Sequence, residues 1–195
     1  METSQEGTTQ IHIKNMVCPR CIRIIEDQFA LLQLPVLGVR LGQVDLARPI
    51  QAGEMEQVKS ILAEYGFELL EDKKEKLIEH IKALLIDAIH HKEEKIFTNY
   101  STYLSHAIGK DYSTLSHAFS SLEKVTIEKF IILQKVEYVK AQIEYDELSL
   151  GEIAARLHYS SLSHLSKQFK AVTGYSPTEY RKLQLRGRLP LDQVC

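Results

Sequence analysis

Cysteine is scarce in this chain, and long apolar runs are missing. Three cysteines in 195 residues exclude the disulfide framework that stabilises many small secreted domains, and they indicate a reducing compartment. No apolar run approaches the roughly 18 residues that span a bilayer, and the N-terminus has neither the basic start nor the apolar stretch of a secretory signal. We therefore expect a cytoplasmic protein without a membrane segment.

The motifs of common enzyme classes are missing as well. The sequence has no glycine-rich phosphate loop, no Ser-His-Asp or paired-carboxylate arrangement set on identifiable turns, and no His-x-x-x-His metal helix. Hydrophobic residues make up 44% of the chain, which is enough for folded cores in one large or two small domains. The sequence thus predicts a globular protein that is not an enzyme.

The net charge of −2 argues against indiscriminate coating of nucleic acid, but the distribution of charge matters more than the sum. Acidic residues gather between positions 144 and 152. Basic residues gather nearer the C-terminal end, at Lys167, Lys170, Arg181, Lys182, Arg186 and Arg188. Phosphate contact is therefore expected at that end.

Residues 8–72 alternate between strand-like and helix-like patterns. Residues 11–14 alternate apolar and polar side chains, and residues 22–32 have apolar side chains at helical spacing. Short strands at 36–41 and 44–46, a helix at 54–65 and a strand at 67–70 follow. The order βαββαβ predicts an α+β, ferredoxin-like domain in which two helices cover one face of an antiparallel sheet.

Residues 73–92 predict a linker helix. Leu77, Ile81, Leu84 and Ala88 recur at alternating steps of four and three, in a stretch without glycine or proline. This stripe either packs on the chain's own domains or forms the contact of a homodimer. Both alternatives stay open, because barely two heptads are present.

The most informative pattern is an inexact repeat at a spacing of fifty residues. Residues 115–119, LSHAF, align with residues 165–169, LSKQF, and residues 126–130 align with residues 176–180, all without a gap. Each copy has the pattern of a short helix, a turn opened by Ser, Thr or Asp, and a second amphipathic helix. Residues 93–184 are therefore expected to form an all-α domain with two helix-turn-helix motifs, which suggests DNA binding.

A segment without helix breakers, Thr126 to Tyr145, joins the two copies. Its apolar residues recur at helical steps, so we predict a rigid helix that holds the motifs apart. Recognition helices that enter successive major grooves on one face of DNA must lie about one helical turn, roughly 34 Å, apart. Ser149 and Ser176 each stand three residues before a glutamate, and this capping arrangement predicts two further helix starts.

The C-terminal half resembles the DNA-binding domain of the AraC/XylS family of bacterial transcription regulators. Residues 152–170, EIAARLHYSSLSHLSKQFK, and residues 172–181, VTGYSPTEYR, carry the match. The resemblance implies that the second helix of each motif, Asp111 to Leu122 and Ser161 to Val172, reads bases. The residues implied to face DNA are Ser113, Ser116, His117, Ser163, His164, Ser166 and Lys167.

The chemistry of these side chains agrees with that role. Hydroxyl, imidazole and ammonium groups at helical spacing can hydrogen-bond base edges or phosphates, while Leu and Phe occupy the opposite face of each helix. Serines alone would more often mark a solvated helix face, and the repeat and the resemblance favour DNA contact. The second motif is expected to dominate affinity. Its turn carries His158 where the family usually has glycine, the residue best suited to positive φ.

Residues 9–72 resemble a heavy-metal-associated domain, the small copper-chaperone fold. The match consists of Met16-x-Cys18-x-x-Cys21 after the first strand, the βαββαβ order, and an aromatic-Gly-Phe turn at residues 65–67. Two thiolates in a loop that leads into a helix N-terminus have depressed pKa values and can hold a soft ion such as Cu(I) from two sides. Cys18 and Cys21 could bind Cu(I) or another soft metal, could act as a thiol-disulfide sensor, or could belong to a fold retained without that ligand.

The combined prediction is a bacterial DNA-binding transcription regulator whose N-terminal domain responds to a soft metal and whose partner is double-stranded DNA. The expected divisions are residues 8–72, 73–92 and 93–184, with a tail at 185–195. The alternative is a cytosolic Cu(I) metallochaperone whose helical C-terminal half docks a protein partner. A steep loss of duplex affinity with rising salt would distinguish the regulator from the chaperone.

Overall fold

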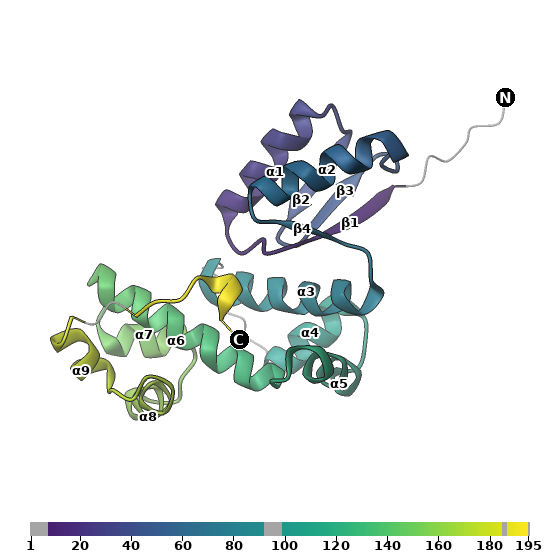
Figure 1. The fold of residues 1–195 in the computed structure, drawn as a ribbon. Coiled ribbons are helices and arrows are strands. Elements are labelled where there is room, and N and C mark those ends of the chain that lie inside the picture. Colours follow the sequence, from purple (N-terminus) through teal and green to yellow (C-terminus); the bar gives the residue numbers. More distant parts are fainter. Residues whose placement is uncertain (1–7, 92–98, 185–186, 195) are drawn as a thin grey trace. The chain divides into compact units, whose positions relative to one another are not determined.

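The structure, a computed structural model, describes residues 8–91, 99–184 and 187–194 (Figure 1). The chain divides between Asp87 and Ala88 into an N-terminal unit and a C-terminal unit. In the part that the structure describes, no helix is long and apolar enough to cross a bilayer. The predicted start of the helical domain, at residue 93, lies outside the described residues.

The N-terminal unit is built on a four-stranded antiparallel sheet. Along the chain its elements are β1 (Thr9–Lys14), α1 (Pro19–Leu31), β2 (Val36–Arg40), β3 (Gln43–Leu46), α2 (Ala52–Glu64) and β4 (Glu68–Leu70). The strands lie in the order β2-β3-β1-β4, and each neighbouring pair is antiparallel. The element order is the predicted βαββαβ.

The core of this unit lies between the sheet and the two helices, which cover one face of the sheet in Figure 1. The alternation of β1 turns Ile11 and Ile13 toward this core, opposite Val44 of β3 and Leu69 of β4. The helices add the buried side chains Ile25, Phe29, Val58 and Leu62. Burial of this apolar area is the main stabilisation of the unit.

After the sheet, α3 (Lys73–Ile86) continues as a short π-helix, Asp87–His91. The carboxylate of Asp72 starts α3 by accepting hydrogen bonds from the backbone N–H groups of Lys74 and Glu75. The predicted helix therefore extends at least to His91. Self-association through this segment stays a prediction.

The C-terminal unit is helical in its described part. Its helices are α4 (Tyr100–Ile108), α5 (Tyr112–Glu123), α6 (Ile127–Tyr145), α7 (Leu150–Arg156), α8 (Leu162–Thr173) and α9 (Pro177–Lys182), with a 3-10 turn at Leu191–Gln193. The long predicted connection is α6, and its N-cap Thr126 accepts a hydrogen bond from the backbone N–H of Lys129. Two pairs of short helices, α4 with α5 and α7 with α8, thus precede and follow one long helix.

The fifty-residue repeat has a structural counterpart. The equivalent buried residues of α5 and α8 are Leu115, Phe119, Leu165 and Phe169. The ring of Phe119 meets Phe130 edge-on at 5.6 Å between centroids, and Phe169 meets Tyr180 in the same way at 5.4 Å. Each motif therefore has a small aromatic core of its own. The two aromatic residues of the second motif stand fifty positions after those of the first.

Both predicted capping arrangements are confirmed. The Ser149 hydroxyl accepts from the backbone N–H of Glu152 at 3.2 Å, and the Glu152 carboxylate accepts from the backbone N–H of Ser149 at 2.8 Å. Ser176 and Glu179 form the same pair of bonds at 3.2 and 2.7 Å. The bond with Ser149 also holds the pKa of Glu152 below its ordinary value. Helices α7 and α9 start where the sequence predicts.

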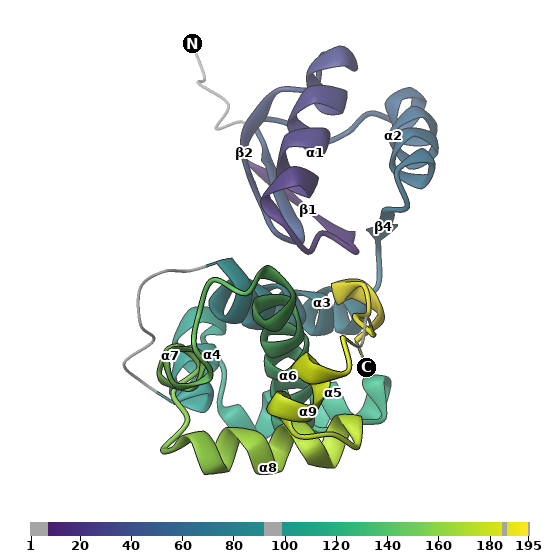
Figure 2. The same cartoon turned by 90° about the vertical axis from the view of Figure 1, so that its left-hand side faces the viewer.

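α6 is the long helix that the sequence predicts, and it buries polar side chains as well as apolar ones. The apolar positions Phe130, Val136 and Val139 are buried as expected, but Gln134 and Glu137 are buried too. The C-terminal segment, residues 187–194, lies beside α6 in Figures 1 and 2 and bonds to both polar side chains, and His90 also contacts Gln134.

Hydrogen bonds tie this segment to α6. Lys140 Nζ lies 2.6 Å from Glu137 Oε1 and donates to the carbonyl oxygen of Gly187 at 2.8 Å. The other Glu137 oxygen accepts from the backbone N–H of Leu189 at 3.0 Å. A buried ion pair thus bonds to the carbonyl of Gly187 and to the N–H of Leu189, and it attaches this segment to α6.

Candidate nucleic-acid interface

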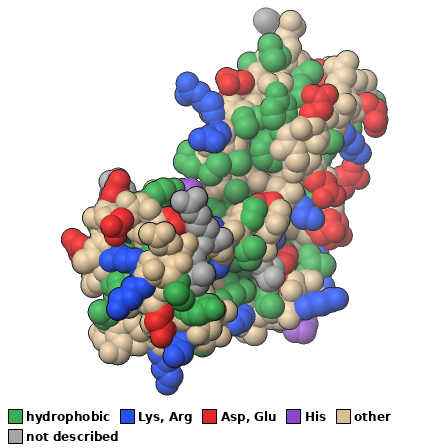
Figure 3. All heavy atoms as spheres, turned by 60° about the vertical axis from the view of Figure 1, so that its left-hand side comes forward, with side chains coloured by type: hydrophobic (Ala, Val, Ile, Leu, Met, Phe, Trp, Pro, Cys, Tyr) green, Lys and Arg blue, Asp and Glu red, His purple; other side chains and the backbone are tan. Residues whose placement is uncertain are grey.

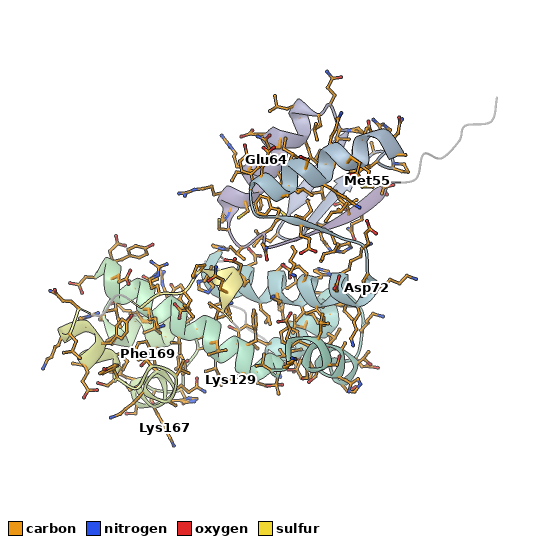
Figure 4. All side chains as sticks on the ribbon, in the orientation of Figure 1. Met55, Glu64, Asp72, Lys129, Lys167 and Phe169 are labelled. Carbon is orange, nitrogen blue, oxygen red and sulfur yellow. The ribbon has the colours of Figure 1, made fainter. Side chains whose placement is uncertain are left out.

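Helices α5 and α8 carry the residues that were predicted to face DNA. The observed limits of both helices lie within one residue of the predicted ones, with Asp111 and Ser161 as N-caps. The exposed members of the predicted set are Ser113, His117, Ser163, His164 and Lys167. Ser116 and Ser166 are half-buried at the edge of this face. In Figure 4, Lys167 points away from the helical body, whereas Phe169 lies on the opposite side of α8.

Helices α5 and α8 run in nearly the same direction, as two recognition helices on one face of DNA would. Both are seen nearly end-on in Figure 1 and from the side in Figure 2, so they run almost parallel. Tyr112 near the start of α5 and His164 near the start of α8 line one hollow. The N-terminal ends of both helices therefore lie on the same side of α6.

The imidazole of His164 is held in place at the start of α8. Its Nδ1 lies 3.2 Å from the hydroxyl oxygen of Ser160, and its ring meets Tyr159 edge-on at 5.2 Å between centroids. The Ser161 hydroxyl accepts from the backbone N–H of the same histidine at 3.1 Å. An imidazole fixed on two sides loses little rotamer freedom when it binds a base or a phosphate.

The turn before α8 has the backbone conformation that the family's usual glycine would suit. His158 has φ of 56°, in the left-handed region that is open to glycine at little cost. The backbone N–H of Tyr159 continues the turn by donating to the carbonyl of Ala154 at 2.9 Å. The departure from glycine therefore leaves the geometry of the turn intact.

The repeat also identifies a residue that sequence reasoning missed. Thr114 of α5 is exposed and stands fifty positions before His164. Comparing the two copies position by position would have found it. In the first half of α5, residues 112–118, the exposed side chains are then Ser113, Thr114 and His117.

Two of the basic residues expected to favour phosphate contact form ion pairs with acidic residues of the same chain. Arg181 lies 3.7 Å from Asp146 and donates to the carbonyl of Leu148 at 3.3 Å. Arg188 lies 3.5 Å from Glu144, with its guanidinium 5.7 Å from the centroid of the Tyr145 ring.

Lys167, Lys170 and Lys182 are exposed, whereas Arg186 lies outside the described residues. On the face shown in Figure 3, basic side chains are interspersed with acidic and neutral ones. The acidic residues near position 144 therefore neutralise part of the charge that the sequence appeared to offer to DNA, and the lysines of α8 become the main basic groups on a recognition helix.

In the N-terminal unit, Cys18 and Cys21 lie together at the start of α1. Cys18 is the N-cap, Pro19 is the first helical residue, and the two sulfur atoms are 3.4 Å apart. Both thiols are half-buried. Within residues 8–91, 99–184 and 187–194, no group of three or more His, Cys, Asp or Glu side chains could hold a metal ion. A close pair of thiols suits a soft monovalent ion better than structural Zn²⁺, which takes four ligands.

The expectation of depressed thiol pKa values is wrong for Cys21. Partial burial raises the pKa of this thiol, and that effect outweighs the hydrogen bonds from the backbone at the helix start. Met16, the first residue of the predicted motif, is packed in the core at 1% exposure.

The two motifs and the helix that joins them define a double helix-turn-helix domain. Residues 104–183 match a family model described as a helix-turn-helix domain, of the AraC type, so the predicted resemblance is confirmed for this part of the chain. The match does not include residues 8–72, and their resemblance to a heavy-metal-associated domain stays a prediction.

Several solved structures are similar to this chain. The DNA-binding transcriptional dual regulator from Escherichia coli K-12 is 17% identical, with a TM-score of 0.45 over 55% of this chain and 90% of that chain. The C-terminal domain of AraT, a response regulator from Geobacillus stearothermophilus, is 19% identical, with a TM-score of 0.46 over 60% and 90%. The DNA-binding domain of AdpA, in complex with a target DNA, is 20% identical, with a TM-score of 0.41 over 58% and 93%. Among curated proteins no match is found.

Proposed function

We propose that this protein is a cytoplasmic, sequence-specific transcription regulator that binds double-stranded DNA with α5 and α8 in successive major grooves. One observation carries the proposal: the AraC-type domain presents two parallel helices with equivalent buried Leu and Phe positions and equivalent exposed polar faces. Both helices present hydroxyl groups and one imidazole, but only α8 adds the ammonium group of Lys167, so α8 supplies most of the affinity.

The direct test is selection of duplexes from a random library by the full-length protein at near-physiological salt. The proposal expects enrichment of a motif with two half-sites about ten base pairs apart, which is the spacing of successive grooves on one DNA face. A library that emerges without any enriched motif would contradict the proposal. It would favour the alternative of a metallochaperone with a helical docking module.

Replacing Lys167 with alanine is expected to weaken binding to the selected duplex about tenfold, because a base-edge or phosphate contact is lost. If the ammonium contacts a phosphate, the slope of log affinity against log salt also becomes less steep by about 1. Fluorescence anisotropy at several salt concentrations measures both quantities. Lys73→Ala, at the exposed start of α3, is the matched control and should change neither. Equal affinities for the two variants would exclude Lys167 from the interface.

For the N-terminal unit, the proposal assigns a sensor of ferredoxin-like fold. The strand order β2-β3-β1-β4 and the two helices on one face of the sheet support that fold. The paired thiols of Cys18 and Cys21 support a soft metal such as Cu(I) as the signal. Binding would order the loop at the start of α1 and change the availability of the reading helices.

The double substitution Cys18→Ser and Cys21→Ser is expected to abolish binding of one equivalent of Cu(I), because hydroxyls are poor ligands for a soft ion. Competition with a chromophoric Cu(I) chelator under reducing conditions measures the loss. Cys195→Ser is the matched control and should bind as the unchanged protein does. If the double variant retains the copper-dependent change in DNA affinity, the sensor assignment is removed while DNA binding itself stands.

A further inference from the structure

A hollow of about 430 Å³ lies between the two helix-turn-helix motifs, and Lys135 of α6 is one of the residues that line it. The hollow is also lined by Tyr100 at the start of α4, Tyr159 in the turn before α8, and His164 of α8. Both motifs and the connecting helix therefore contribute to one small region.

The ammonium group of Lys135 contacts three separate elements. Lys135 Nζ donates to the carbonyl oxygen of Leu157 at 2.7 Å, and it lies 5.2 Å from the ring centroid of Tyr100 and 5.0 Å from that of Tyr159. Leu157 is the C-cap of α7, where unpaired carbonyls carry partial negative charge. One cation thus joins the first motif, the second motif and the helix between them.

These contacts offset the free-energy cost of partly removing the Lys135 ammonium from water. Burial lowers the pKa of Lys135 to about 8, so the group is still mostly protonated at neutral pH. A cation near an aromatic face is attracted by the ring quadrupole, and the attraction strengthens when water is excluded. Among the described residues, no carboxylate lies within ion-pair distance of this ammonium in the structure. The two rings and the carbonyl therefore hold the charge.

We propose that Lys135 is a positioning residue that fixes the register of α8 relative to α5 and thereby sets the distance between the two DNA half-sites. The inference rests on the proposed function. Tyr159 connects Lys135 to the exposed face of α8 that is proposed to bind DNA. Its ring contacts the Lys135 ammonium on one side and meets the His164 ring edge-on on the other. Loss of the cation frees the turn before α8 from the first motif, while the exposed face of α8 keeps its residues.

The experiment compares the full-length protein with Lys135→Met and Lys135→Arg. Each binds a library in which the two selected half-sites are separated by spacers that vary one base pair at a time. The unchanged protein selects one spacing, and Lys135→Met loses about tenfold of that discrimination, because two cation–π contacts are removed. Lys135→Arg retains a cation and rescues the selection. Affinity for a duplex with the second half-site alone is the same in all three proteins.

Three results separate the possible failures. If the unchanged protein enriches no paired motif, the proposed function itself fails. If it selects one spacing and Lys135→Met selects the same spacing as sharply, the positioning role is overturned. If Lys135→Met instead reduces the salt slope by about 1, Lys135 contacts a phosphate and the inference is also overturned.

A second pair of variants keeps the test valid if Lys135→Met does not fold, which its thermal melting curve reveals. Tyr159→Leu removes one ring from the cation, and Tyr159→Phe keeps the ring without its hydroxyl. Broadened spacing in the leucine variant with normal spacing in the phenylalanine variant supports the role of the cation. Equal spacing selection by both variants contradicts it.

Discussion

Lys140→Met is expected to destabilise the C-terminal unit by about 3 to 5 kcal/mol, because it leaves the carboxylate of Glu137 buried without a counter-charge. Glu137 and Lys140 are 5% and 8% exposed, and their charged atoms lie 2.6 Å apart. The substitution also removes the donor to the carbonyl of Gly187. We expect residues 187–194 to detach from α6 together with the loss of stability.

The control is the double variant Glu137→Leu and Lys140→Met, which removes both charges. Its loss of stability should be clearly smaller than that of the single variant, because no lone charge remains buried. Urea denaturation followed by circular dichroism measures the free energies, and hydrogen exchange at Leu189 reports whether the segment detaches. If the single and double variants are equally unstable, the pair contributes through packing rather than through charge.

Phe169→Ala is expected to reduce the stability of the C-terminal unit by about 3 to 5 kcal/mol, the usual cost of emptying a buried aromatic site. Phe169 is 1% exposed and forms the core of the second motif with Tyr180. Because Phe119 occupies the equivalent position in the first motif with Phe130, Phe119→Ala should cost a similar amount. The two variants can be compared in the same urea experiment.

Leu162→Ala serves as the control for these truncations, because Leu162 is on α8 but 43% exposed. It should change stability by no more than about 0.5 kcal/mol. The repeat further predicts that Phe169→Ala weakens the second half-site and Phe119→Ala the first. A large cost at one phenylalanine and a negligible one at the other would show that the two motifs are not equivalent in energy.

The repeat and the helix starts could be predicted because local chemistry specifies them. Buried Leu and Phe at fixed spacing define the inner face of α5 and α8, since a helix can bury only one stripe there. Ser149 and Ser176 satisfy free N–H groups within the same turn, so three residues of sequence contain the whole interaction. The order of strands and helices in the N-terminal unit follows from equally local patterns.

Interactions between distant polar residues could not be predicted in this way. Lys135 and Lys140 look like ordinary solvated lysines of α6, and only the fold brings Leu157 to one and Gly187 to the other. The same holds for His90, whose Nε2 lies 3.0 Å from Oε1 of Gln134. A periodic pattern indicates which apolar side is buried, but a covering segment such as residues 187–194 can bury the polar side as well.

Ion pairing at one candidate site and burial at the other explain why reasoning from charge was incomplete. Arg181 and Arg188 count as free cations in the sequence, yet acidic residues from positions 144 and 146 lie beside them. Cys21 stands at a helix start, which favours the thiolate, yet its partial burial has the larger effect. In both cases the partner or the exposure is a property of the fold.

The parallel course of α5 and α8 gives a bound monomer a polarity. A two-fold dimer meets a palindrome and looks the same from either end, whereas two helices that point the same way bind a site without two-fold symmetry. The exposed residues of the two helices also differ, with Thr114 and His117 on α5 and His164 and Lys167 on α8. Inverting such a site in front of a gene would leave its affinity unchanged and turn the whole protein around. Promoter output should therefore depend on the strand that carries the site.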